Sequence, residues 1–240
     1  MSAENVPFDY FERYRVVSEV VRQRQTWKVL GDIAKPVEFP DGLTAKWDPV
    51  VRDAVQLSGW APFHYARNHD GLAEPWRFHV LYSEDCRKIG QRIPVWFEDV
   101  KPSNKLPSML AACGALVLVN WLPQFDEQLA TEKQVLINEE HLAATSAAVQ
   151  NLLLLLTAAG LGTYWSSGGF FRDPLMAGKL DIDPAEKLIA AVFVDYLPDY
   201  AEPAIERIAG KHRSSRDADL NWVREVKILD EPAANSQGDL

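Results

Sequence analysis

Residues 139–169 read EEHLAATSAAVQNLLLLLTAAGLGTYWSSGG, and this stretch decides the fold. Small residues and then large apolar ones fill every face of it, so the pattern predicts a fully buried helix over 142–159. Gly160 follows at the C′ position, where many helices end. A short strand over 163–165 then leads into 166–169, where two glycines can leave backbone N–H groups open to a flat ligand.

The composition is typical of an ordinary globular protein. Of 240 residues, 47% are hydrophobic and 25% are charged, which suits one large domain. The net charge of −9 argues against nonspecific nucleic-acid binding. No apolar run reaches the roughly 18 residues of a membrane span, and no secretory signal is evident at the start. The two cysteines lack the spacing of a metal site or a disulfide framework. We therefore expect a cytoplasmic protein with no membrane or nucleic-acid partner.

Hydrophobic periodicity predicts helices that outnumber a few strands. The expected helices cover 10–24, 142–159 and 174–179. A further helix is expected to open at Asp48-Pro49 and to end at Gly59. The expected strands cover 76–82, 115–121, 163–165 and 188–196. Residues 64–74 and 101–107 are typical of loops, and 231–240 of a disordered tail. The sequence therefore predicts a single α+β domain over 1–230, built around one central sheet.

Two basic clusters stand out in this acidic chain. They consist of Arg22, Arg24 and Lys28 near the start, and Lys211, Arg213 and Arg216 near the end. Either they are solvated helix ends or they bind a compact anion such as a phosphate. Arg24, Thr26 and Lys28 occupy alternate positions, so an extended segment would aim a guanidinium, a hydroxyl and an ammonium at one side.

Four motifs occur in the order found in nitroreductase-like flavoproteins. Arg24-Gln-Thr-Trp-Lys28 resembles the Arg-Arg-Ser-x-Arg/Lys signature of that family. Ala61-Pro62 with Pro75-Trp-Arg-Phe78 resembles its Ala-Pro and Gln-Pro-Trp-x-Phe segments. Residues 147–169 resemble its central helix and glycine turn, and Lys211-His-Arg213 resembles its closing Lys/Arg-x-Arg.

The resemblance implies a nitroreductase-like sandwich with a mainly antiparallel sheet flanked by helices, assembled as a homodimer with flavin sites at the interface. It implies bound FMN, NADH or NADPH as a transient donor, and a nitroaromatic, quinone or similar small acceptor. The flavin carries this chemistry, so no catalytic side chain is assigned. Residues 62–64 are expected to pack on the flavin of the partner subunit. Trp76 and Trp165 are expected to lie near the cofactor. The expected cofactor-binding residues are Arg24, Gln25, Thr26, Lys28, Pro62, Phe63, His64, Trp165, Ser166, Ser167, Gly168, Gly169, Lys211 and Arg213.

The chain departs from the family pattern in three places. Gln25 stands where the signature has its second Arg, and Glu74 replaces the Gln before Pro75. The Asn that usually precedes this segment is absent, and HYARNHDGLA is inserted at 64–73. These departures keep open a second function, a flavin-binding protein for storage or sensing with little reductase turnover. A third reading is an α+β protein with no cofactor.

Other chemistries find little support in the spacing. His69-Asp70 and Glu139-Glu140-His141 contain metal-ligating residue types, but no HExxH or carboxylate-rich motif accompanies them, so we expect no metal. Glu139–His141 more simply begin the long helix, where acids favour the positive end of the helix dipole. The chain also lacks Gly-x-Ser-x-Gly and GxGxxG motifs, which argues against a serine hydrolase and a Rossmann site.

Overall fold

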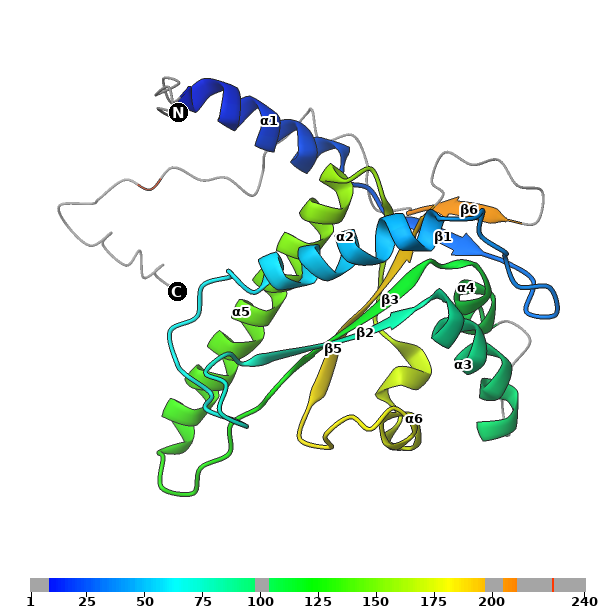
Figure 1. The fold of residues 1–240 in the computed structure, drawn as a ribbon. Coiled ribbons are helices and arrows are strands. Elements are labelled where there is room, and N and C mark those ends of the chain that lie inside the picture. The colour runs from blue at the N-terminus through cyan, green and yellow to red at the C-terminus, as the bar shows by residue number, and fades with distance from the viewer. Residues whose placement is uncertain (1–8, 98–103, 197–204, 211–225, 227–240) are drawn as a thin grey trace, which may run out of the picture. The chain divides into compact units, whose positions relative to one another are not determined.

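A computed structural model of the chain describes residues 9–97, 104–196, 205–210 and 226 (Figure 1). Contacts divide the chain into two units, Met1–Gly210 and Lys211–Leu240, and every element below belongs to the first unit. The disordered tail expected at 231–240 lies outside the described residues. The single domain expected over 1–230 stays a prediction.

The first unit is built on a four-stranded antiparallel sheet. Its strands are β2 (Trp76–Tyr82), β3 (Ala115–Trp121), β4 (Gly162–Ser166) and β5 (Lys187–Asp195), in the spatial order β2-β3-β5-β4. Each neighbouring pair is antiparallel. The predicted sheet and its strands are therefore confirmed, with β4 at one edge and β2 at the other.

Helices cover both faces of this sheet (Figure 1). On one face lie α2 (Leu43–Ser58) and α5 (Thr131–Ala158), which pack on Val117, Val119 and neighbouring residues. The other face is covered by α3 (Ser83–Trp96), α4 (Leu106–Ala112), the 3-10 turn η1 (Gly169–Arg172) and α6 (Pro174–Lys179). Leu116 and Leu118 face that second core. Because alternate residues of β3 enter different cores, the whole strand reads as an apolar run.

A second, two-stranded sheet joins the two ends of the described chain. Strand β1 (Trp27–Leu30) pairs antiparallel with β6 (Glu206–Ala209). Just before β1, Thr26 forms a parallel bridge with Thr163 of β4. Helix α1 (Tyr10–Gln23) precedes β1, and Asp9 caps it by accepting hydrogen bonds from the first turn. The small sheet therefore lies beside the β4 edge of the large one.

The long helix α5 differs from the prediction in its start and its burial. It begins at Thr131, so Glu139–His141 lie within it rather than at its start. Residues 131–138 are mostly polar and exposed, so they show no apolar periodicity, although several are good helix formers. Nor is the helix fully buried, because Leu142 is exposed and Leu154 and Leu155 are half-buried. The predicted end is confirmed, with Gly160 at φ 79°.

Helix α2 begins before the Asp48-Pro49 pair that was expected to open it. Its first residue is Leu43, and Pro49 lies inside the helix, where it cannot donate a backbone hydrogen bond. The carboxylate of Asp48 does not cap the helix. It accepts a hydrogen bond from the Tyr196 hydroxyl at 2.7 Å instead. This contact and burial raise the pKa of Tyr196.

Other differences concern elements that the periodicity left out. Helix α3 and strand β6 were not predicted, and α4 begins at Leu106 inside the expected loop 101–107. By length and composition, α5 is a helix that could cross a membrane. Its packing against α2 and β3 identifies it as a core helix instead.

Candidate functional site

The predicted phosphate-binding residues meet where β1, β4 and β6 come together. Arg24 ends α1, and its Nη1 lies 3.5 Å from Thr26 Oγ1. The backbone carbonyl of Thr26 accepts a hydrogen bond from the N–H of Gly210 at 2.9 Å. Lys28 extends along β1 and places Nζ 4.7 Å from the centroid of the Tyr164 ring on β4. The structure therefore brings Arg24 and Thr26 together and keeps Lys28 against the same edge strand.

The residues of the first basic cluster lie in two places. Arg22 is on helix α1, whereas Arg24 and Lys28 lie with Thr26 where β1, β4 and β6 come together, a place called the corner below. Arg22 lies exposed in the last turn of α1, and Gln25 is exposed between Arg24 and Thr26. Arg24 itself is half-buried. Lys211 and Arg213 lie outside the described residues, so their placement stays a prediction. Lys211 is nevertheless the residue covalently next to Gly210, which is hydrogen-bonded to Thr26.

An ion pair holds β6 next to β5. No pattern in the sequence indicates it. Arg207 on β6 donates from Nε to Asp195 Oδ2 at 2.7 Å and from Nη2 to Oδ1 at 3.3 Å. Both side chains are largely buried. Such a two-point guanidinium–carboxylate contact fixes orientation as well as distance. No sequence motif marks it, because its two members come from different strands.

The turn after β4 is the second part of the predicted site. Gly168 has φ 105° and Gly169 has φ 53°, both in the left-handed region. A Cβ at Gly168 would lie 2.3 Å from Leu188 Cδ2, whereas one at Gly169 would meet nothing within 4 Å. The N–H of Gly168 already donates to Ser166 Oγ. The expectation that both glycines leave room for a ligand is therefore corrected: Gly168 packs against the core, and Gly169 alone leaves open space.

Strand β4 links the corner to the turn. Thr163, opposite Thr26, and Ser166, at the start of the turn, are three residues apart on one strand, or roughly 10 Å. Between them Trp165 is partly exposed, and its Nε1 donates to Ile189 O at 3.4 Å. The corner and the turn therefore lie along a single edge of the sheet.

Residues 62–64 lie away from this edge. Phe63 packs edge-on against Trp76 at a centroid distance of 5.5 Å, and Trp76 starts β2 at the opposite edge of the sheet. Trp76 is buried in a core cluster with Ala61 and Ala148, and its expected place near the cofactor stays a prediction. His64 is exposed, and its Nδ1 lies 2.9 Å from Glu140 Oε2 on α5. The structure thus does not bring Pro62, Phe63 and His64 to the remaining site residues within one chain.

Side chains on β2 and β3 form a polar network with Glu186 that no sequence motif indicates. Glu186 Oε2 lies 2.6 Å from His79 Nε2 and accepts a hydrogen bond from Asn120 Nδ2 at 2.7 Å. Asn120 Oδ1 is buried and accepts no hydrogen bond from the part of the chain that the structure describes. A cavity of about 350 Å³ is lined by Asn120, Glu186, Asp183 and Leu188, among others. The Leu188 wall is the one that packs against Gly168.

His141 belongs to a structural contact in the core. It is buried within α5, and its Nε2 lies 3.0 Å from the backbone oxygen of Tyr65. Burial lowers the pKa of His141 and keeps the imidazole neutral. This neutral ring holds the inserted segment against α5.

Comparisons with known proteins place these features in a family. Residues 48–196 match the model described as the nitroreductase family. A Bacillus subtilis protein named "Putative NAD(P)H nitroreductase YfhC" is 28% identical over 169 residues, which cover 68% of this chain and 81% of that protein.

Solved structures share the fold. A nitroreductase-like family protein from Bacillus cereus superposes with a TM-score of 0.59 at 20% identity, covering 96% of this chain and all of that one. A "putative nitroreductase in complex with fmn" from Desulfovibrio desulfuricans superposes with a TM-score of 0.53 at 20% identity, covering 89% and 98%.

Proposed function

Because the chain belongs to the nitroreductase family, we propose that it binds FMN and passes hydride from NADH or NADPH to a small acceptor. The acceptor class we propose is a nitroaromatic, a quinone or a similar compound. We place this activity in the cytoplasm.

The observation that carries the proposal is the edge of the sheet along β4. At one end Arg24, Thr26 and Lys28 offer a guanidinium, a hydroxyl and an ammonium beside a backbone hydrogen bond to Gly210. These are the donors that a phosphate with close to two negative charges requires. Lys211 and Arg213 would add two further cations from the residues that follow Gly210.

The other end of this edge suits a flat ring. Trp165 is partly exposed there, and Gly169 leaves open space in front of its backbone. The roughly 10 Å along β4 between the corner and the turn is of the order that a five-carbon ribityl chain spans. FMN would supply the redox chemistry, and the chain would bind, orient and shield it.

A homodimer is part of the proposal. The apolar face of α1 is uncovered within the described residues, with Phe11, Tyr14 and Val17 all exposed. An apolar groove of about 540 Å³ runs between α1, the end of α2 and α5, next to Trp60. A second copy of the chain would bury these surfaces, as obligate homodimer interfaces commonly do over more than about 2,000 Å². It would also bring its own residues 62–64 to this chain's flavin.

The second candidate is a flavin-binding protein with little turnover. The insertion at 64–73 is what favours it, because contacts from Arg67 to Leu122 O and from His69 to Asp183 hold this loop in place. A loop held in this way would limit access for an acceptor. Steady-state oxidation of NADH or NADPH with nitroaromatic and quinone acceptors separates the two candidates.

Cofactor identity is the first test of the proposal. We expect the purified protein to show a flavin absorption spectrum, and heat-released flavin to run as FMN on a column. Release of FAD, or a colourless protein that takes up no FMN when it is added, would contradict the proposal.

A further inference from the structure

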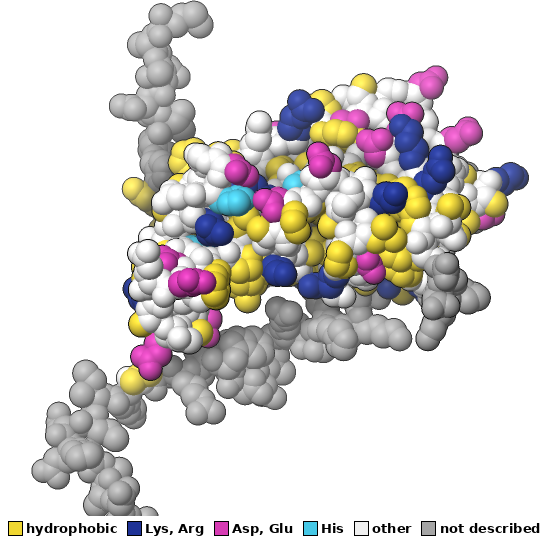
Figure 2. Space-filling model, turned by 90° about the horizontal axis from the view of Figure 1, so that it is seen from below, with side chains coloured by type: hydrophobic (Ala, Val, Ile, Leu, Met, Phe, Trp, Pro, Cys, Tyr) yellow, Lys and Arg dark blue, Asp and Glu magenta, His cyan; other side chains and the backbone are white. Residues whose placement is uncertain are grey.

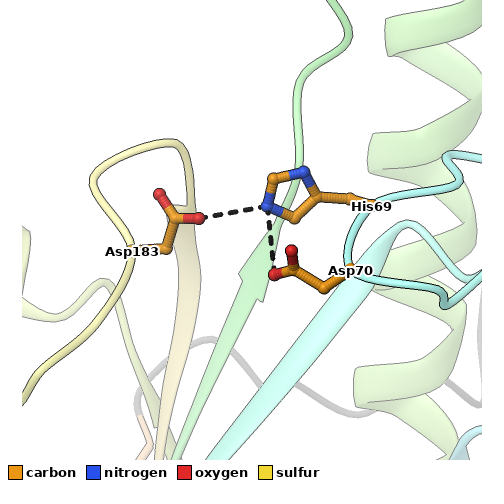
Figure 3. Close-up of side chains that lie close together, drawn as sticks. All are labelled: His69, Asp70 and Asp183. Carbon is orange, nitrogen blue, oxygen red and sulfur yellow. Dashed lines mark hydrogen bonds and ion pairs between the residues drawn. The ribbon is translucent and has the colours of Figure 1, made fainter.

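The inserted loop places two potential metal ligands against a third from a distant part of the chain. His69 Nε2 lies 3.0 Å from Asp183 Oδ2 and 3.4 Å from Asp70 Oδ2 (Figure 3). These three atoms all lie within 4.8 Å of one another. Figure 3 shows both carboxylates directed at the same imidazole nitrogen, Asp70 from the loop before β2 and Asp183 from the loop before β5.

A single N–H group on His69 cannot satisfy both carboxylates. Nε2 carries at most one proton, yet two carboxylate oxygens converge on it, and these repel each other. Ligands bound tetrahedrally to Zn²⁺ at 2.0–2.2 Å would lie about 3.3–3.6 Å apart. The distance from His69 Nε2 to Asp70 Oδ2, 3.4 Å, falls in that range, and the distance to Asp183 Oδ2, 3.0 Å, is slightly shorter. Because all three atoms lie within 4.8 Å of one another, small side-chain movements would give the spacing that a bound ion requires.

The cavity next to Asp183 contains a buried polar oxygen that also lacks a donor among the residues that the structure describes. Asp183 lines it together with Asn120 and Glu186. Asn120 is only 3% exposed, and its Oδ1 accepts no hydrogen bond within the described residues. A buried carbonyl oxygen without a donor is costly unless water or a cation reaches it. On the face seen in Figure 2, histidine side chains lie next to acidic ones.

Backbone contacts hold the ligands in place. Arg77 Nη2 donates to the carbonyl of His69 at 2.7 Å, and Arg77 is paired across the sheet with Asn120. Asp183 accepts a hydrogen bond from the backbone N–H of Ala185 at 2.8 Å. Both loops are therefore fixed by bonds that do not involve the three ligand atoms.

We propose that His69, Asp70 and Asp183 bind one divalent transition-metal ion of the Zn²⁺ class, with water completing its coordination. A mixed imidazole and carboxylate set favours such an ion over Mg²⁺ or Ca²⁺. The side chains are 27%, 76% and 39% exposed, which leaves room for water and for exchange of the ion. The ion clamps the insertion to the loop before β5. The proposal differs from the expectation of no metal, which rested on local spacing and did not include Asp183.

The test is a titration of the full, tag-free chain after treatment with a chelator. Calorimetry near neutral pH should show one Zn²⁺ bound per chain, and Zn²⁺ should raise the melting temperature. His69→Ala and Asp183→Asn should each weaken binding at least about tenfold, since each removes a ligand. Asp70→Asn changes an exposed side chain, so its expected loss of affinity does not depend on a folding defect.

Two matched controls accompany these variants. Asp181→Asn removes the same charge in the same loop, and Asn tolerates its φ of 54°, so Zn²⁺ affinity should not change. His64→Ala removes another exposed histidine that faces a carboxylate, Glu140, and should also bind Zn²⁺ normally. If the wild-type protein binds no Zn²⁺, or the three ligand variants bind it as well as the controls, the proposal is wrong. Equal affinity for Mg²⁺ or Ca²⁺ would overturn the choice of ion.

Discussion

At the scale of single residues, two arginines two positions apart have different surroundings. Arg22 is exposed on the last turn of α1, whereas Arg24 is half-buried and lies within reach of Thr26. A cation held beside a hydroxyl and a backbone carbonyl binds a phosphate in one orientation, whereas an exposed one contributes only a screened charge. The difference between these neighbours is therefore a direct test of the corner.

Replacing Arg24 with Ala should weaken FMN binding about tenfold to a hundredfold, since losing a charged hydrogen bond costs roughly 1.5–3 kcal/mol. Replacing Arg22 with Ala should change it much less. Fluorescence titration of the apoprotein with FMN measures both. Equal losses in the two variants would show that the phosphate lies elsewhere.

His141 gives stability a dependence on pH. Burial lowers its pKa below the ordinary value of 6.5, so the unfolded chain takes up this proton at a higher pH than the folded one. Its contribution to stability is complete above about pH 6.5 and is lost as the pH falls toward the lowered, folded pKa. Urea unfolding at a series of pH values should thus show a loss of stability between pH 7 and 5. His141→Gln should lose less over the same interval, and an unchanged slope would remove His141 as the cause.

At the scale of elements, the turn after β4 depends on two glycines for different reasons. Gly168 has no room for a Cβ beside Leu188, but Gly169 has open space. Both have positive φ, so an Ala at either position costs about 1–2 kcal/mol in backbone strain alone.

Gly168→Ala should therefore destabilise the protein by clearly more than Gly169→Ala, because overpacking adds about 1–3 kcal/mol to the strain. Urea unfolding of the two variants measures the difference. Their FMN affinities should show the opposite order if Gly169 faces the ring. A Gly168→Ala variant as stable as Gly169→Ala would mean that the close contact with Leu188 is absent.

Whether an element could be predicted depends on whether its own residues show its burial. The apolar runs of strands β3 and β5 predict their burial directly, whereas the aromatic and β-branched residues of β2 predict a strand that is only half-buried. The sequence does not indicate the start of α5, because residues 131–138 are mostly exposed and carry helix propensity without periodicity. Asp48-Pro49 was read as a cap because local preference favours it, but the Tyr196 hydroxyl, far along the chain, determines where Asp48 binds.

The same limit applies to the candidate site. Local motifs located Arg24, Thr26 and the glycine turn, and the structure places them along one edge. The spacing of residues along the sequence does not indicate contacts between distant segments. Examples are Arg207 with Asp195 and His69 with Asp183. Trp76, an aromatic residue in a recognised motif, is buried in the core, and its place near the cofactor stays a prediction.

At the scale of the whole molecule, the apolar face of α1 is an uncovered surface within the described residues. Val17 on this face is 59% exposed, and Val95 on α3 is 72% exposed and belongs to the opposite side of the sheet. If α1 packs against a second chain, a charged residue in place of Val17 would weaken the dimer. A charged residue in place of Val95 would not.

Light scattering over a dilution series should show a particle of twice 27.0 kDa. Val17→Lys should shift the protein toward monomer, because an unpaired charge in an apolar interface is strongly unfavourable. Val95→Lys is the control and should remain dimeric. A wild-type monomer that retains FMN would contradict both the dimer and the shared flavin site.

The pairing of β1 with β6 also bears on how the protein is made. Trp27 is synthesised early, yet its strand partner Ala209 is among the last residues of the first unit to leave the ribosome. Closing so long a loop is slow, and contacts of this sequence separation form late in folding. The corner around Thr26 thus stays incomplete until Gly210 has been synthesised, because its bond to Gly210 has no donor before then. Any ligand that needs this corner is therefore acquired only after the whole first unit has been made.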